Sequence, residues 1–233
     1  MKLNTKRTIL VGLAFLSISA FWQLYDSIIP LILKNTFHIS DTISGGIMAM
    51  DNVALFMLPF FGSLSDKVHT RLGRRTPFIL CGTAAAVIAM LFLPFADNIV
   101  SLGLFVTALC VTLVAMGSYR SPAVSLMPDV TPKPLRSKAN AIINLMGAVG
   151  GVISLILIAT LIPKTGKPNY FPIFLVVALV MAASVLILLW KVKENPLREE
   201  REKIDLDLDI EEGTVQDEAA ASAPMAPEVK RSL

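Results

Sequence analysis

Charged residues are scarce in this sequence, and so are the residues that support metal or nucleophilic chemistry. Asp, Glu, Lys and Arg make up 17% of the 233 residues, whereas hydrophobic residues make up 54%. This balance is too apolar for an ordinary soluble domain. The two cysteines, Cys81 and Cys110, both fall inside apolar stretches, where we expect small buried side chains with no disulfide and no metal site.

Signatures of enzymes are missing as well. The two histidines, His38 and His69, lie in or near expected loops, and the sequence contains no Gly-x-Ser-x-Gly elbow, metal-spaced His/Glu set or phosphate-binding glycine loop. An intramembrane enzyme is therefore a weaker hypothesis, and we expect no catalytic residue and no cofactor. The basic residues belong to short loops between apolar stretches, so they do not indicate nucleic acid, and no such partner is expected.

Long apolar stretches are what the sequence has in abundance. A helix needs about 20 apolar residues to cross the hydrocarbon core of a bilayer. The first stretch is too long for the core of a cleavable signal peptide. We therefore expect an all-α membrane protein, embedded in the lipid bilayer through six transmembrane helices at residues 8–33, 43–64, 77–96, 99–118, 139–162 and 170–190.

The charges divide the chain into two parts. Residues 1–193 contain 16 Lys and Arg against 6 Asp and Glu, and we expect them to form the transmembrane domain. The basic residues gather mainly in loops 65–76 and 119–138, so the positive-inside rule places both termini in the cytoplasm, beneath the plasma or inner membrane. Residues 194–233 contain 5 basic and 12 acidic residues and lack aromatic ones, which predicts a disordered cytoplasmic tail.

Several polar residues interrupt the apolar stretches. A carboxylate near the middle of a membrane helix costs about 2.5–3.5 kcal/mol, so it needs a partner or a function. For Asp26 and Asp51 the alternative is a structural hydrogen bond to a neighbouring helix, and for Arg120 it is a side chain that extends to a lipid phosphate. We expect a pathway for substrate and protons lined by Gln23, Tyr25, Asp26, Asp51, Asn52 and Arg120.

The loop between the second and third stretches carries the most specific motif in the chain. From residue 62 to residue 79 it reads GSLSDKVHTRLGRRTPFI. The pattern G-x-x-x-D followed by R-x-G-R-R is matched by Gly62, Asp66, Arg71, Gly73, Arg74 and Arg75. The alternative interpretation is an ordinary positive-inside loop, because four basic residues lie within nine positions.

This loop resembles the one between helices 2 and 3 of major facilitator transporters. The four residues between Asp66 and Arg71, and the trailing Pro-Phe-Ile, resemble the sugar-carrying branch that includes the sucrose/proton symporters and is related to glycoside-pentoside-hexuronide carriers. The Arg136-Ser-Lys-Ala-Asn sequence at the start of the fifth stretch resembles the same branch. The resemblance implies that the loop, together with Asp129, is a conformational latch rather than a ligand site.

The resemblance also implies one half of a major facilitator fold, built from two inverted three-helix repeats. Substrate binds between the two halves of this fold, so we expect a second six-helix half as a partner, covalent or separate. The acidic tail looks like the start of the central loop between them. The chain is then a gene fragment, a truncated product, one member of a split pair or a half-sized carrier that dimerises, and we favour a fragment.

For the coupling ion we favour a proton over sodium. The melibiose-carrier relatives resemble this chain around D-x-P-x-x-S-L-x-P, and residues 120–128 here read RSPAVSLMP, so Arg120 replaces an acidic sodium ligand. Ala54 and Leu58 occupy two further acidic positions of those relatives. Asp51 remains as the proton-carrying group, with Arg120 as its expected counter-charge.

The sequence thus predicts a secondary transporter that moves a small molecule, a sugar or glycoside, with protons. Two alternatives within this class are an uncoupled facilitator and a transporter of another small solute. A structural or assembly membrane protein is an alternative of another class. It would explain the apolar stretches, but not Asp51, Arg120 and the motif together.

Overall fold

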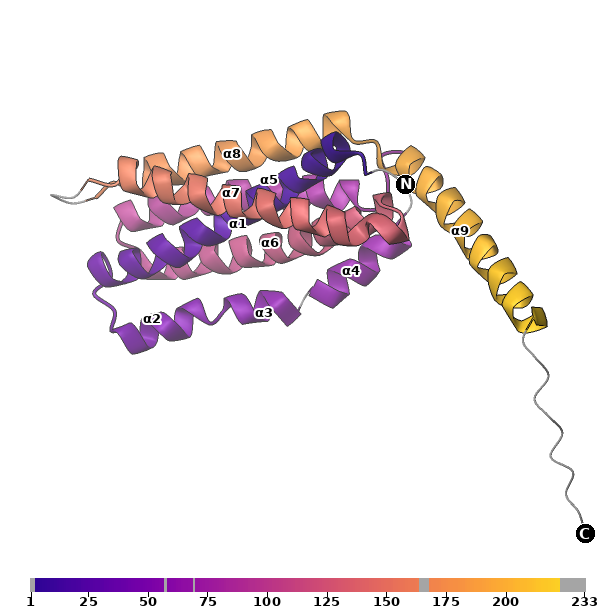
Figure 1. Ribbon diagram of the computed structural model, residues 1–233. Coiled ribbons are helices and arrows are strands. Elements are labelled where there is room, and N and C mark those ends of the chain that lie inside the picture. Colours follow the sequence, from indigo (N-terminus) through magenta and orange to yellow (C-terminus); the bar gives the residue numbers. More distant parts are fainter. Residues whose placement is uncertain (1–2, 57, 69, 164–167, 223–233) are drawn as a thin grey trace, which may run out of the picture.

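The computed structural model describes residues 3–56, 58–68, 70–163 and 168–222, with backbone alone for 53–55 and 211–222. These residues fold into helices joined by short connections, and no strand occurs among them. The main body is a bundle of five long helices that run side by side (Figure 1). They are α1 (Thr5–Asn35), α5 (Thr76–Asn98), α6 (Leu102–Val130), α7 (Arg136–Leu161) and α8 (Phe171–Lys191).

Each of these five helices is long and apolar enough to cross a membrane. They contain between 21 and 31 residues, and about 20 are needed at a rise of 1.5 Å per residue. The structure therefore confirms an all-α membrane fold and five of the six predicted spans.

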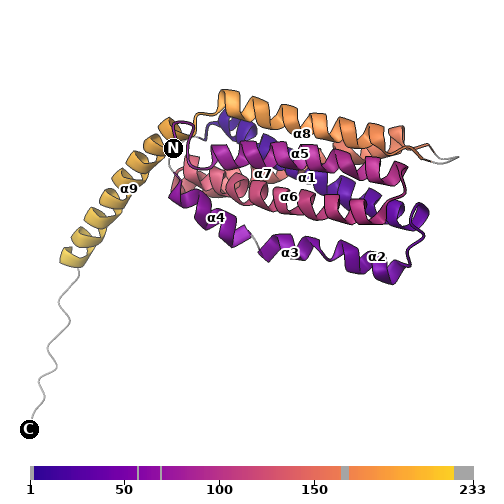
Figure 2. The same cartoon turned by 180° about the vertical axis from the view of Figure 1, so that it is seen from behind.

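The sixth predicted span, residues 43–64, is not one continuous helix. It is covered by α2 (Asp41–Met48), α3 (Asp51–Phe56) and α4 (Leu58–Lys67), which follow one another along one side of the bundle (Figures 1 and 2). Of these, α2 contacts α1, whereas α3 and α4 contact α6.

The break between α2 and α3, at residues 49–50, has local causes in the sequence. The side-chain amide of Asn52 donates to the Ala49 carbonyl at 3.2 Å, which competes with the hydrogen-bond ladder of a helix. The pair Gly45 and Gly46 lowers the helix propensity of α2.

The core lies around α1, which packs against α7 and α8 on one side and α6 on another. Gly150 allows α7 to cross α1 closely, because a Cβ atom there would lie 2.1 Å from the Leu16 carbonyl oxygen. Near this crossing the Ser154 hydroxyl donates to the Ala20 carbonyl at 2.7 Å. On the α6 side the buried Tyr119 hydroxyl donates to the Ala14 carbonyl at 2.9 Å. Backbone carbonyls of α1 thus accept hydrogen bonds from both α7 and α6.

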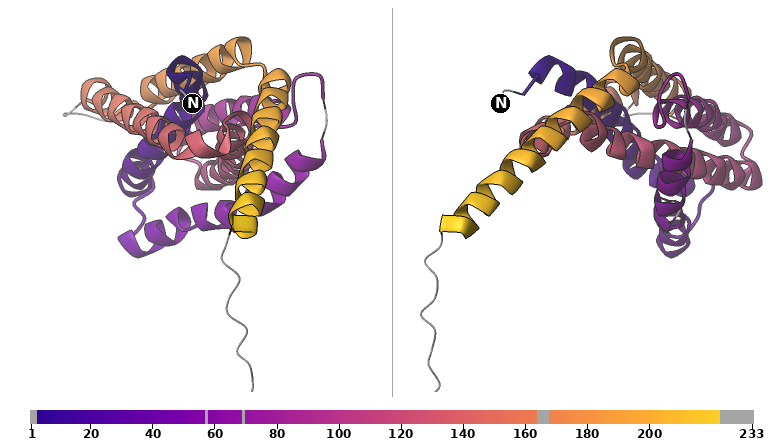
Figure 3. Two further views of the ribbon diagram at one scale, coloured as in Figure 1. Left: turned by 45° about the vertical axis from the view of Figure 1, so that its right-hand side comes forward. Right: turned by 90° about the vertical axis from the view of Figure 1, so that its right-hand side faces the viewer.

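The segment after α8 differs from the disordered tail that its composition predicts. Glu194–Ser222 forms helix α9, which leads away from the bundle (Figure 3). Basic residues are interspersed among the acids at helical spacing, so Arg198 pairs with Glu202 at 2.8 Å, and such pairs stabilise a helix. The Arg198 hydrogen bond and charge lower the pKa of the Glu202 carboxyl. Residues 223–233 of the predicted tail lie outside the described residues.

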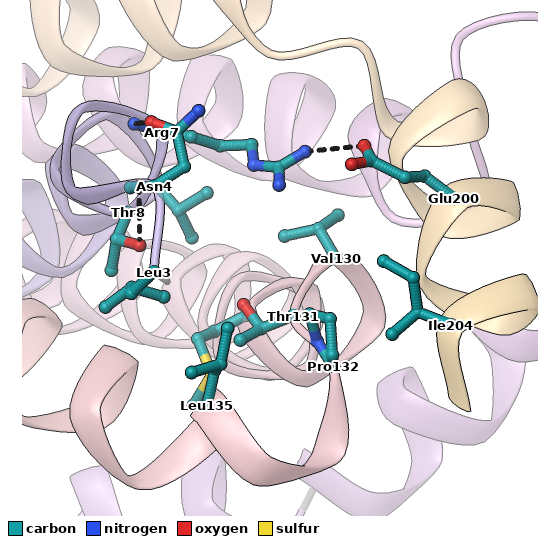
Figure 4. A pocket seen from close by; sticks show the side chains of 12 residues that line it. Leu3, Asn4, Arg7, Thr8, Val130, Thr131, Pro132, Leu135, Glu200 and Ile204 are labelled. Atoms are coloured by element: carbon teal, nitrogen blue, oxygen red, sulfur yellow. Dashed lines mark hydrogen bonds and ion pairs between the residues drawn. The ribbon is translucent and has the colours of Figure 1, made fainter. Parts of the chain in front are cut away.

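The first half of α9 also makes contacts with the bundle. Arg7 in the first turn of α1 pairs with Glu200 at 2.9 Å, across a small cavity of about 210 Å³ (Figure 4). Asp205 accepts a hydrogen bond from the backbone N–H of Lys133 at 2.9 Å, in the short 3-10 helix η1 (Lys133–Leu135) that joins α6 to α7. We call this end of the bundle, where α1 begins and α8 ends, the basic end.

Candidate functional site: a polar groove and a charged loop

A groove of about 600 Å³ opens between α1, α6 and α7. Its polar lining includes Gln23 and Asp26 on α1, Arg120 on α6 and Asn144 on α7, and Trp22 supplies an aromatic surface. Three of the six predicted pathway residues, Gln23, Asp26 and Arg120, therefore meet in one groove. A groove of this size is within the range of small-molecule sites.

Helix geometry explains which residues of α1 reach the groove. Residues 15, 18, 19, 22, 23 and 26 line it, and this spacing of three and four places them on one face. Tyr25 lies about 100° around the helix from its neighbours, and its side chain is buried elsewhere. Its hydroxyl donates to the Met48 carbonyl at 2.9 Å, so it holds the end of α2 against α1.

Arg120 lies over Trp22, with the guanidinium carbon 5.7 Å from the ring centroid. This is the geometry of a cation–π contact. Among the described residues Arg120 has no ion pair within 4.0 Å. The predicted pairing of Arg120 with Asp51 is therefore not formed, because Asp51 lies on α3 and Arg120 faces the groove beside α1.

Asp51 lies near α1 but outside the groove. Its carboxylate is within electrostatic range of Tyr25 and Asp26. Asn52 is exposed and uses its side chain on the Ala49 carbonyl. The predicted pathway residues thus divide into a groove set and a second set around Asp51.

Asn144 was missed by reasoning from the sequence. It lies on the same face of α7 as Gly147 and Gly151, which also line the groove. A polar residue spaced three and seven positions from two glycines could have indicated a groove, because small residues leave room beside a polar side chain.

The second cluster lies at the basic end, where the loop before α5 meets the ends of α4 and α6. Asp129 on α6 accepts from Arg74 at 2.8 Å and from Arg75 at 2.9 Å. Asp66 on α4 lies 2.5 Å from Arg75 and 3.7 Å from Arg74. Two arginines and two aspartates thus join three elements of the fold, and Asp129 lies 54–55 positions after the two arginines.

Burial makes this network more than a surface ion pair. The Arg75 side chain is 6% exposed and that of Asp129 is 12% exposed, whereas that of Asp66 is 50% exposed. Burial lowers the pKa of the Arg74 guanidinium, but the hydrogen bond to Asp129 and the nearby carboxylates raise it overall. Removal of Asp129 would leave both arginines without a largely buried partner.

The predicted motif residue Gly62 lies where α4 approaches α6. The Ser121 hydroxyl donates to the Leu58 carbonyl at 2.8 Å, and a Cβ atom on Gly62 would lie 3.0 Å from that hydroxyl. The Gly62 carbonyl also accepts from Arg75 at 3.1 Å, beside a short hydrogen bond from Arg75 to Ser65. Arg71, by contrast, has no side-chain partner among the described residues and stays outside the network.

Glu194, at the start of α9, completes the loop and was not predicted. Its carboxylate is 1% exposed and accepts from the backbone N–H groups of Arg74, Arg75 and Thr76 at 2.9–3.0 Å. It also accepts from the Thr76 hydroxyl at 2.8 Å. A carboxylate at this place satisfies the free N–H groups of α5 and complements its dipole.

Gly73 is required by the same arrangement. Its φ of +125° is unfavourable for other residues, and a Cβ atom there would lie 2.1 Å from a Glu194 carboxylate oxygen. Asn195 adds hydrogen bonds from its side-chain amide to the Thr70 and Arg71 carbonyls, at 3.1 and 3.3 Å. The loop is therefore fixed from α4, α6 and the α8–α9 junction together.

The fold and these two clusters define a helical multi-pass membrane protein with a polar groove among its helices and a charged loop at one end. The chain belongs to the Major Facilitator Superfamily, whose family model matches residues 11–228. This membership confirms the resemblance seen in residues 62–79.

Among known proteins, the chain is similar to a sucrose transport protein of Arabidopsis thaliana. The two are 28% identical over 152 residues. The match covers 57% of this chain and 25% of that relative, so the matched part of the chain spans about a quarter of the relative's length.

Proposed function

We propose that the chain is part of a secondary transporter that moves a sugar or glycoside across a membrane, and that the groove is its half of the substrate site. The observation that carries this proposal is the meeting of Gln23, Asp26, Arg120 and Asn144 beside Trp22, inside a membrane bundle of this family. Amide and carboxylate groups suit sugar hydroxyls, and an aromatic ring suits the apolar face of a sugar. The similarity to a sucrose transport protein supports a sugar as the class of substrate.

Proton coupling is the second part of the proposal. Asp51 lies near Tyr25 and Asp26, and carboxylic acids inside a membrane bundle are suited to carry protons. The sequence-based hypothesis paired Asp51 with Arg120. In the structure the neighbours of Asp51 are Tyr25 and Asp26 instead. Arg120, Ala54 and Leu58 occupy the positions of acidic sodium ligands in the melibiose carriers that this chain resembles, which favours a proton over sodium.

The third part of the proposal concerns the arrangement of the chain in the membrane. Residues 1–193 are one half of the transporter, residues 194–233 begin the connection that follows it, and a second half covers the groove. Both termini and the loop predicted at residues 65–76 lie in the cytoplasm. A latch that favours one conformation is formed by the network of Asp66, Asp129, Arg74 and Arg75. Asp66→Asn therefore shifts the conformational equilibrium and leaves the substrate affinity of each state unchanged.

Topology is tested by labelling single cysteines in a variant that lacks Cys81 and Cys110. Lys138→Cys, at the basic end, should react with a membrane-impermeant thiol reagent only when the cytoplasmic side is accessible. Thr36→Cys, at the other end of α1, should react only from outside. The reverse pattern would overturn the orientation.

Function is tested by uptake of a radiolabelled sugar into vesicles that contain the chain, with and without a supplied second half. Gln23→Ala, Asp26→Asn and Arg120→Gln should each reduce uptake at least tenfold, whereas Asp41→Asn, in an exposed ion pair outside the groove, should not. Uptake that is insensitive to all three groove substitutions would refute the site. Uptake driven by sodium at fixed pH, or with no response to a pH gradient, would refute proton coupling.

A further inference from the structure

A second, mainly apolar groove lies on the outside of the bundle, at the basic end. It has a volume of about 690 Å³ and forms where the first turns of α5 meet the last turns of α8, helices that lie side by side (Figure 2). None of its residues lines the polar groove. Its apolar surface is supplied by Leu72, Leu80, Leu186, Leu189 and Trp190.

Basic side chains surround the mouth of this groove. Arg71 lines it from the loop before α5, and Lys193 lines it from the connection after α8. Lys191 lies over the ring of Trp190, 4.0 Å from its centroid. Trp190 itself is 76% exposed, and an exposed Trp with a neighbouring Lys at a helix end is typical of the membrane–water interface.

These basic residues have no acidic partner in the part of the chain that the structure describes. No ion pair within 4.0 Å involves Arg71, Lys191 or Lys193, whereas Arg74 and Arg75, a few residues from Arg71, each pair with aspartates. The carboxylate of Glu194 also borders the groove, but it is 1% exposed and is already hydrogen bonded to residues 74–76. The mouth therefore presents uncompensated positive charge.

We propose that this α5–α8 groove binds a glycerophospholipid with an anionic headgroup. The phosphate lies against Arg71 and Lys193, and an acyl chain follows the leucines of α5 and α8. Positive side chains beside membrane helices at the interface attract anionic headgroups, and the long apolar wall below them suits an acyl chain. A water-soluble anion would gain nothing from that wall.

The position of the groove gives the lipid a structural consequence. Arg71 and Lys193 lie on the two segments that Asn195 joins by its hydrogen bonds to the Thr70 and Arg71 carbonyls. A headgroup that contacts both basic side chains spans the same junction. Bound lipid therefore holds the loop before α5 against the start of α9.

The test uses the purified full chain in detergent, with added phosphatidylglycerol or phosphatidylcholine and native mass spectrometry to count the lipids retained. The chain should retain phosphatidylglycerol in preference to phosphatidylcholine. Arg71→Gln and Lys193→Gln should each lower the affinity for phosphatidylglycerol about fivefold, and the double variant about 25-fold. Lys138→Gln removes an exposed positive charge at the same end but outside the groove and should change nothing.

Two further arms test whether the protein binds the whole lipid and not its charge alone. Trp190→Ala should also reduce retention, and it should leave the fold intact because the exposed side chain contributes little buried surface. Glycerol phosphate, which carries the charge without acyl chains, should not displace the lipid. Equal loss in Lys138→Gln, displacement by glycerol phosphate, or absence of any preference for phosphatidylglycerol would each overturn the proposal.

Discussion

Replacement of Glu194 by alanine should open the loop before α5. The carboxylate accepts hydrogen bonds from three consecutive backbone N–H groups and one hydroxyl while almost fully buried. Each buried donor left without a partner costs about 1–3 kcal/mol, but water that enters the space left by the side chain will satisfy part of them. We therefore expect a local loss of about 3 kcal/mol, which corresponds to an increase of roughly 150-fold in the open population.

Hydrogen exchange followed by mass spectrometry measures this directly on the peptide that contains residues 74–76. These amides should exchange roughly two orders of magnitude faster in Glu194→Ala, with a smaller increase in Glu194→Gln, which keeps one acceptor oxygen. Glu200→Ala is the matched control, because it removes an acid from the same helix but only a partly exposed ion pair with Arg7. Unchanged exchange at residues 74–76 in Glu194→Ala would refute the role of Glu194 in holding the start of α5.

Three other substitutions, two of them with a matched comparison variant, test the geometry through unfolding in detergent. Gly73→Ala should destabilise the fold by about 1–3 kcal/mol, because the positive φ at residue 73 is strained for alanine and the added Cβ atom would meet the Glu194 carboxylate. A neutral effect would contradict that geometry. Asp129→Asn should cost about 3 kcal/mol by leaving two arginines poorly paired, whereas the half-exposed Asp66→Asn should cost less than about 1 kcal/mol. The opposite order would contradict the burial argument. Gly150→Ala should cost about 1–3 kcal/mol, because it forces α7 away from α1. Gly151→Ala should be nearly neutral, because the nearest atom to a Cβ there lies 3.8 Å away. Equal effects would refute the close crossing.

Residue types and spacing predicted the helices well where the apolar pattern was uninterrupted. They failed at 43–64, where mean apolarity is high but a turn at residues 49–50, beside Asn52, interrupts the helix. A count of apolar residues measures the preference of a segment for the membrane and not the continuity of its backbone hydrogen bonds. Local polar competition therefore decides the structure of this segment.

The candidate site was predictable in part for a related reason. Polar residues stand out in apolar stretches, so Gln23, Asp26 and Arg120 could be found, but their partners depend on how the helices are arranged. Arg120 faces Trp22 rather than Asp51, and nothing in the spacing along the chain distinguishes these two outcomes.

Glu194 shows the same limit over a longer range. It follows its hydrogen-bond partners by about 120 residues and opens a segment whose acidic composition predicts disorder. Composition averages over the segment and hides the one carboxylate that the fold buries at the start of α5. Its role follows only from the return of the chain to the basic end after α8.

The contact between Arg7 and Glu200 bears on the order in which the protein is assembled during synthesis. The two residues are separated by 193 positions, so at about 5–20 residues per second the partner of Arg7 is made about 10–40 s after it. The first turn of α1 therefore leaves the ribosome long before the helix that will cover it exists. Its final environment is set only after the helices between it and α9 have been made, so the start of α1 and the first turns of α9 are among the last parts of the chain to be joined.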